Sequence, residues 1–171
     1  MSDSGSDGTD GVAMRMRMRR YGLAVVGAVA AGALVLGTGG TAWAGEADLE
    51  VHGSAVLGGG LMEVRLSPRD HGPDALSGAS VRLRWSAALA DAQRLPAGCA
   101  RTGDREVVCG TGPLAVDEPG EQLVVPVRLR ERPSEVTLSV DVAWSGGVVD
   151  HDRTNDTQRV LVLATGDPYV F

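Results

Sequence analysis

The feature that most constrains this 171-residue chain is a repeated alternation of apolar and polar residues. Its longest example covers residues 136–144, where apolar side chains alternate with Thr137, Ser139 and Asp141. A period of two is typical of a strand with one buried face, whereas an amphipathic helix repeats about every 3.6 residues. No convincing helical repeat is present after residue 44. The chain is therefore predicted to be all-β.

Seven alternating segments are separated by short turns. The turns are rich in Gly, Pro, Asp and Asn, which favour the backbone conformations that turns require. Pro126 lies within one segment and predicts an edge strand, because proline has no N–H to donate to a neighbour. About seven short antiparallel strands indicate a β-sandwich. We expect these strands near residues 48–56, 62–68, 81–85, 107–109, 123–129, 136–144 and 160–162.

Residues 1–44 are predicted to be a cleaved signal peptide. An arginine-rich stretch precedes an apolar run at residues 21–36, and the small-x-small sequence at 42–44 then precedes Gly45. An uncleaved membrane anchor is the alternative, but the run is shorter than the ~20 residues that a spanning helix needs. Residues 1–13 are acidic and unlike the start of a signal, so translation from Met14 is another possibility. Residues 45–171 would then form a single domain with no membrane span.

The charge of residues 45–171 argues against nucleic acid as a partner. All sixteen basic residues of the chain are arginine, and 12 of them follow residue 44, against 19 acidic residues, for a net charge of −7. Binding to nucleic acid requires clustered cations that contact the phosphates. The same balance disfavours anionic membrane surfaces. Arginine in place of lysine throughout fits a GC-rich bacterial genome, and we expect a secreted protein, free or associated with the cell wall.

The two cysteines, Cys99 and Cys109, are predicted to form a disulfide bond, because an exported chain meets an oxidising compartment. Closing so short a loop stabilises the fold by about 2.5–3 kcal/mol in the chain-entropy description. The spacing does not match a Cys-x-x-Cys redox motif, and two free thiols are the alternative. A bridge this local cannot join two sheets.

The two tryptophans of the mature segment are predicted to be core residues. Trp85 is in phase with Leu83, and Trp144 is in phase with Val142. Both rings would then lie between the sheets. The alternative is that they are exposed platforms for carbohydrate, which stacks on aromatic faces.

No constellation of residues predicts catalysis or a cofactor. A Gly-x-Ser-x-Gly elbow is missing, and the glycines at 58–60 lack the lysine and helix of a phosphate loop. The three histidines lie in separate segments without metal-ligand spacing: His52, His71 and His151. We expect a protein that is not an enzyme.

The segment 150–156 is the one place where the sequence makes a ligand chemically plausible. Four oxygen-bearing side chains, which Ca²⁺ prefers, lie within it: Asp150, Asp152, Asn155 and Asp156. It is not an EF-hand, since Asn155 stands at the glycine position and Leu161 at that of the bidentate glutamate. We favour a polar loop whose Asp and Asn side chains bond their own backbone. Any calcium binding would then be no tighter than about 10⁻⁴ to 10⁻³ M.

The order of five short motifs resembles the bacterial Ig-like surface-repeat domain known as domain of unknown function eleven, and the related bacterial cell-adhesion-type domain. The motifs lie at residues 69–75, 95–99, 108–109, 112–114 and 150–156. The family typically has Asn-Asn where this chain has Asn155-Asp156, and it often occurs in tandem, whereas this chain has no internal repeat. The resemblance implies an Ig-like sandwich without a catalytic role.

Together these features predict a secreted, non-catalytic Ig-like module of the cell envelope or extracellular space. It would act through surface contacts with an unknown protein or cell-wall partner. The alternative is a secreted ligand binder or protease inhibitor that uses the Cys99–Cys109 loop, with Arg101 and Arg105 inside it.

Overall fold

The computed structural model describes residues 45–171, so the predicted signal peptide, its cleavage after Ala44 and the start at Met14 lie outside the described residues. The described chain is all-β and contains no helix, and hence none long and apolar enough to cross a membrane. Its strands are β1 (Glu46–Ala47), β2 (Leu49–Gly58), β3 (Leu61–Asp70), β4 (Ser80–Trp85), β5 (Cys99–Gly103), β6 (Glu106–Gly110), β7 (Leu123–Arg128), β8 (Glu135–Trp144), β9 (Val149–Asp150), β10 (Thr157–Leu163) and β11 (Pro168–Val170).

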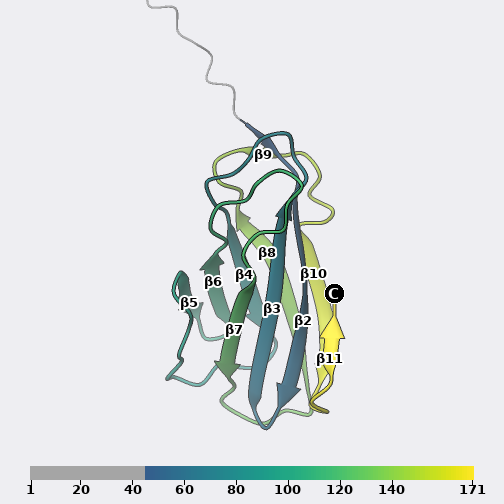
Figure 1. Ribbon diagram of the computed structural model, residues 1–171. Helices are drawn as coiled ribbons and strands as arrows, with labels where there is room; N and C mark the ends of the chain where they lie inside the picture. Colours follow the sequence, from purple (N-terminus) through teal and green to yellow (C-terminus); the bar gives the residue numbers. More distant parts are fainter. Residues whose placement is uncertain (1–44) are drawn as a thin grey trace, which may run out of the picture. The chain divides into compact units, whose positions relative to one another are not determined.

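These strands form two antiparallel sheets and one short parallel pair. The larger sheet has the order β10-β8-β4-β6-β5, and the smaller has the order β11-β2-β3-β7. The two sheets face each other across a shared core, which is consistent with a β-sandwich (Figure 1). Strands β1 and β9 pair in parallel, separately from both sheets.

The count of eleven strands corrects the expected number of about seven. All seven predicted segments are present, as β2, β3, β4, β6, β7, β8 and β10. The other four are β1, β5, β9 and β11. Three of these have only two or three residues, too few to show an alternation, and β5 has no buried side chain. Their strand geometry comes from the neighbours they pair with and not from their own pattern.

The core between the sheets is built from the alternating residues that the sequence indicates. Leu57 and Val64 of the smaller sheet and Leu83 and Leu138 of the larger one are fully buried in it. Burying a side chain of this size contributes about 1.5–3 kcal/mol. Trp85 is 2% exposed in the same cluster, which confirms its prediction as a core residue.

Trp144 corrects the second tryptophan prediction, because it is 54% exposed. Ser80 pairs with Trp144, whereas Val81 pairs with Val142, so Ala143 is an extra residue on β8. A bulge of one residue reverses the side-chain phase of the strand beyond it. The inward-facing positions of the alternation therefore end at Val142. Beyond the bulge, Trp144 turns outward.

Pro126 lies on an edge strand, as predicted, because β7 is the last strand of its sheet. Two residues further along β7, the Gln93 side chain covers the outward-facing backbone groups of Arg128. The Arg128 N–H donates to Gln93 Oε1 at 2.9 Å, and Gln93 Nε2 donates to the Arg128 carbonyl at 2.8 Å. Alternate residues of a strand direct their backbone groups the same way, so Pro126 also faces away from β3. Proline and glutamine together block this edge against another strand.

Candidate functional site

Strands β1 and β9 pair at one end of the domain, where β9 is labelled in Figure 1. Polar side chains gather there, close to the start of β2. The β1–β9 pairing brings Ala47 beside Asp150. Segments about a hundred residues apart in the chain thus share one surface. We call this region the polar end, and define it by Asp48, Glu50, Asp70, His71, Asp117, Asp150, Asn155 and Asp156.

Asp150 and Asp152, in the first half of the segment that the sequence marks as a calcium candidate, accept hydrogen bonds from the backbone of that segment. Asp150 Oδ1 accepts the Asp152 N–H at 3.2 Å, and Asp152 Oδ1 accepts the Thr154 N–H at 3.0 Å. The hydroxyl and then the N–H of Thr154 lower the pKa of Asp152, because both donate to its carboxylate. Asp150 Oδ2 also accepts the Leu49 N–H at 3.1 Å, which ties the segment to β2. These two aspartates confirm the predicted turn role.

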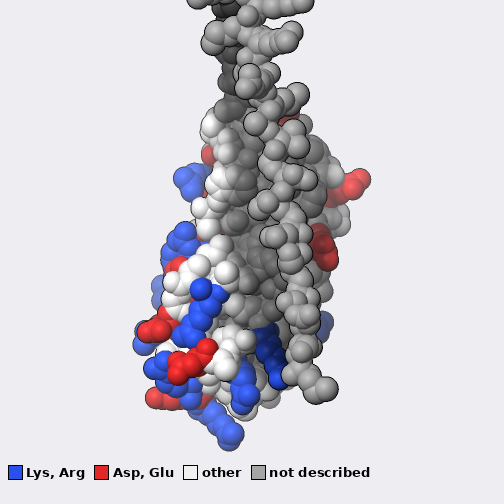
Figure 2. Space-filling view, turned by 90° about the vertical axis from the view of Figure 1, so that its left-hand side faces the viewer, with Lys and Arg blue, Asp and Glu red and all other residues white. Residues whose placement is uncertain are grey.

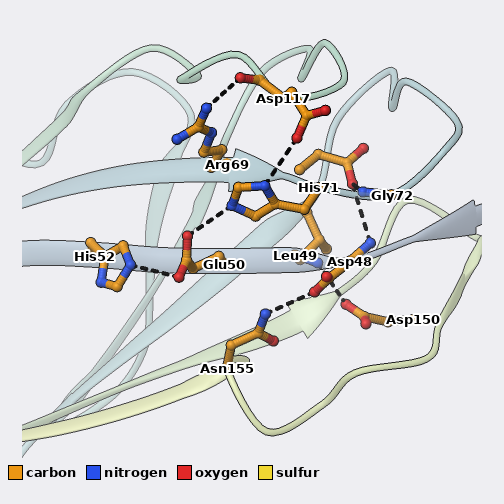
Figure 3. Close-up of polar contacts among 11 residues, drawn as sticks. Asp48, Leu49, Glu50, His52, Arg69, His71, Gly72, Asp117, Asp150 and Asn155 are labelled. Atoms are coloured by element: carbon orange, nitrogen blue, oxygen red, sulfur yellow. Dashed lines mark hydrogen bonds and ion pairs between the residues drawn. The ribbon is translucent and has the colours of Figure 1, made fainter.

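Asn155 and Asp156 behave differently, because they turn toward the domain. Asn155 Nδ2 donates to Asp48 Oδ1 at 2.7 Å across 107 residues of sequence (Figure 3). Asp156 is buried, and Arg153 Nε donates to its Oδ2 at 3.2 Å. Burial raises the pKa of the Asp156 carboxyl, and the charge of Asp150 raises it further. The sequence did not predict the Asn155 contact, since its partner Asp48 is remote in the chain.

The His71-Gly72 motif packs against the parallel strand β1. Asp70 is fully buried, and its Oδ1 accepts the N–H groups of Gly72 at 2.9 Å and Asp48 at 3.2 Å. A Cβ atom on Gly72 would lie 2.4 Å from the Ala47 Cα, closer than two such atoms can approach. Glycine at this position is therefore required by the close approach of two backbone segments.

Two of the three histidines share one carboxylate, which the sequence did not indicate. His71 Nε2 lies 3.0 Å from Glu50 Oε2 and its Nδ1 3.1 Å from Asp117 Oδ1, while His52 Nε2 lies 2.7 Å from Glu50 Oε1 (Figure 3). The bond to Glu50, and then that to Asp117, raises the pKa of His71. The bond from His71 lowers the pKa of Glu50. The only signal in the sequence was Glu50-x-His52 on the polar face of one strand.

A hollow of about 320 Å³ lies beside the polar end, and Trp144 lines it together with Asp150 and Asp156. Val149 is 46% exposed in its wall, and the side chain of Arg153 is also exposed there. An indole face next to donors and acceptors suits a ligand that has both an apolar face and hydroxyl groups. The exposed Trp144 thus gives carbohydrate binding, the alternative to a buried ring, more support than the sequence pattern does.

Cys99 and Cys109 are disulfide-bonded, as predicted, and they are paired neighbours on β5 and β6 of one sheet. Arg101 within this loop does not point freely into solvent. Its guanidinium donates to the carbonyl oxygens of Gly103 and Ala90, both at 2.9 Å. It therefore anchors the neighbouring loop. Arg105 is the exposed arginine of the hairpin.

Figure 2 shows positively and negatively charged side chains close to one another on one face of the domain. Arg84 pairs with Glu106 at 2.9 Å and Arg130 with Asp91 at 3.0 Å. Such pairing places arginine and carboxylate side chains next to each other on this surface.

A larger surface hollow, of about 710 Å³, lies elsewhere, along the protected edge strand β7. Leu61, Met62 and Pro126 give it a mainly apolar lining. It does not include any of the candidate site residues.

Comparison with known proteins adds no relative: no protein-family model matches the chain, and no curated protein matches it. The features that bear on function are therefore the fold, the polar end and the hollow beside Trp144.

Proposed function

We propose that the protein is a secreted, non-catalytic Ig-like module that binds a protein or cell-wall partner through its polar end. The observation that carries the proposal is the outward-turned Trp144. Val149 and Arg153 lie around the same hollow. Tryptophan and arginine are enriched among the residues that dominate binding energy at interfaces. Exposed apolar side chains such as Trp144 and Val149, set among charged groups, are typical of an interaction surface.

The rest of the domain supports such a role as a rigid scaffold. Two sheets share one core, a disulfide links β5 to β6, and Pro126 with Gln93 protects the β7 edge. Ig-like sandwiches carry their binding loops at the ends of the sheets. The polar end occupies such a position.

An extracellular location is part of this proposal. The disulfide is compatible with an oxidising compartment. The predicted signal implies that the secreted form begins at Gly45. N-terminal sequencing of protein from the culture medium checks this, and a secreted form that begins at Met1 or Met14 would contradict cleavage.

The second candidate is a ligand binder that recognises carbohydrate at the same surface, which the exposed Trp144 favours. The protease-inhibitor form of the alternative has less support, because Arg101 is anchored to main-chain carbonyls. An assay against a trypsin-like protease tests the remaining Arg105, and we expect no inhibition.

Capture from cell-envelope extracts of the source bacterium tests the proposal. We expect the wild-type protein to capture a partner and Trp144→Ala to lose at least about tenfold in affinity, in line with an interface hot spot. Leu161→Ala is the matched control, because Leu161 is a similarly exposed apolar side chain on the edge strand β10. Equal capture by both variants would exclude the polar end as the contact surface. Competition by purified wall polysaccharide would favour the carbohydrate candidate.

A further inference from the structure

The two sheets end in four edge strands, and three of these edges are protected against a further strand. Pro126 and the Gln93 side chain block β7. On β5, the Cys99 N–H already donates to the Pro96 carbonyl at 3.2 Å. β11 has only three residues and begins with Pro168, which has no N–H to donate. Unprotected edge strands promote pairing between chains, and natural proteins commonly prevent it by such means.

The fourth edge strand, β10, lacks this protection. It has seven residues and no proline, and Arg159 is its one charged side chain. Leu161 is 50% exposed and Leu163 is 39% exposed. β10 and β11 end the two sheets on the same side of the domain (Figure 1), but they belong to different sheets and do not pair. The larger sheet is therefore open along β10.

The pairing with β8 shows which backbone groups of β10 face outward. Just before β10, the Asp156 carbonyl accepts the Val142 N–H at 3.1 Å. Just after it, the Ala164 N–H donates to the Ser134 carbonyl at 2.8 Å. Alternate residues of a strand direct their backbone groups the same way, so the even-numbered residues of β10 bond β8 and the odd-numbered ones face away from the sheet. The outward-facing residues are Thr157, Arg159, Leu161 and Leu163, and their side chains are exposed as well.

We infer that β10 is a docking surface for a second copy of this chain, with the two β10 strands antiparallel about a two-fold axis at Val160. In this register each outward N–H and C=O group of β10 meets its complement in the second copy. The two five-stranded sheets then form one continuous sheet, as in other cases of strand addition at an open edge. A two-fold contact uses the same surface on both copies and is the commonest arrangement of homo-oligomers.

The side chains of β10 favour a second copy as the occupant. The register centred on Val160 places Arg159 opposite Leu161 of the second copy, so that the arginine stem covers the exposed leucine while its charged head stays in water. Residues 45–171 carry 12 arginines against 19 acidic residues, and two copies therefore repel each other over most of their surface. β10 has no carboxylate of its own, which makes it a suitable place for two acidic domains to meet.

Sedimentation equilibrium of the purified protein tests the inference. A single pair of strands gives a small interface, so we expect a monomer–dimer equilibrium with a Kd of about 10⁻⁵ to 10⁻⁴ M. Association stops at the dimer, because the other three edges are protected. A protein that remains monomeric at about 10⁻³ M, or that forms larger species, would overturn the inference.

Leu161→Pro tests whether the backbone of β10 makes the contact. It removes an outward N–H without loss of a bond to β8, and we expect the Kd of the dimer to rise at least about tenfold. Leu161→Ala keeps this N–H and is expected to change the Kd much less. Val124→Pro is the matched control, because the Val124 N–H faces outward on β7, like that of Pro126, and should leave the Kd unchanged. A folded Leu161→Pro variant that dimerises like the wild type would contradict the assignment.

Charged residues at position 161 test the register and keep the backbone N–H. Leu161→Arg would lie opposite Arg159 of the second copy, whereas Leu161→Glu would pair with it. We therefore expect the Kd of the Leu161→Arg dimer to exceed that of the Leu161→Glu dimer by about threefold or more. Equal weakening by both variants would exclude the axis at Val160.

Amide hydrogen exchange locates the contact in the wild-type protein. Exchange at Arg159 and Leu161 should slow as the protein concentration rises, because their N–H groups become bonded only in the dimer. The N–H groups of Val160 and Val162, which already bond β8, should change less. A dimer that leaves exchange at Arg159 and Leu161 unchanged would place the contact elsewhere. The inference does not depend on the proposed partner, because each of these readouts uses the purified protein alone.

Discussion

The main core, which lies between the two sheets, is organised differently from the polar end, and the two tryptophans mark the contrast. Trp85 ends a regular alternating strand and is buried in the main core. Trp144 also ends an alternating run, but a bulge at Ala143 turns it outward. In the first region a local pattern decides burial. In the second, the pairing with a neighbouring strand overrides that pattern.

The two regions are also held together differently. The main core is a continuous apolar cluster from both sheets. The polar end has only a small apolar cluster, formed by Ala47, Leu49, Leu76, Ala79 and Leu114. Side-chain hydrogen bonds complete it, from Asp70 and Asn155 to Asp48 and from Asp150 to Leu49, the first residue of β2. Apolar burial tolerates small shifts, whereas these bonds require specific partners.

Removing each tryptophan is the strongest test of this contrast. We expect Trp85→Ala to lower the free energy of unfolding by about 3–5 kcal/mol, as truncation of a buried aromatic does. Trp144→Ala should cost less than about 1 kcal/mol, because the ring is largely exposed. Urea denaturation measures both. Similar losses at the two positions would mean that the regions do not differ in this way.

The disulfide adds a covalent contribution to the larger sheet. We expect the double variant Cys99→Ala/Cys109→Ala to lose about 2.5–3 kcal/mol, because the reduced unfolded chain regains the freedom of the closed loop. Calorimetry measures the lower Tm. The wild-type protein should react with a thiol reagent only after reduction, and two reactive thiols in the unreduced protein would contradict the bond.

Gly72→Ala tests how tightly the polar end is packed. We expect a loss of about 1–3 kcal/mol, because the new methyl group would overlap the backbone of Ala47. Gly58→Ala is the control, since no atom lies within 4 Å of the Cβ position there. Equal melting temperatures for the two variants would show that β1 can move away from the turn without loss of stability.

The smallest expected effect is a dependence on pH that is confined to the polar end. The raised pKa of His71 means that its contribution is complete below the unfolded value of about 6.5 and is lost as the pH rises through the folded value. The lowered pKa of Glu50 means that its contribution is present above about pH 4.3 and is lost as the pH falls. The pair therefore contributes most between these two values.

We expect the Tm difference between wild type and His71→Gln to be larger at pH 5.5 than at pH 8.5, and small at both because the pair is partly exposed. Arg84→Gln is the control. It breaks a pair with Glu106 in the larger sheet, and neither partner changes charge over this range. If the Tm difference caused by His71→Gln changed with pH no more than that caused by Arg84→Gln, the pair of His71 and Glu50 would not stabilise the polar end.

The all-β class, the seven main strands, the Pro126 edge, the buried Trp85 and the Cys99–Cys109 bond could all be predicted from the sequence. These features depend on local information. Alternation specifies which side of a strand is buried, proline lacks an N–H, and the two cysteines of a chain that is predicted to be exported have only each other as partners.

The four short strands, the exposure of Trp144 and the assembly of the polar end depend instead on how the whole domain packs. A strand of two residues exists because a partner is present, and a bulge is defined by the register between two strands. The contact of Asn155 with Asp48 joins residues 107 positions apart. Nothing in either segment specifies the other, because their proximity results from the packing of the whole domain and not from their own sequence pattern.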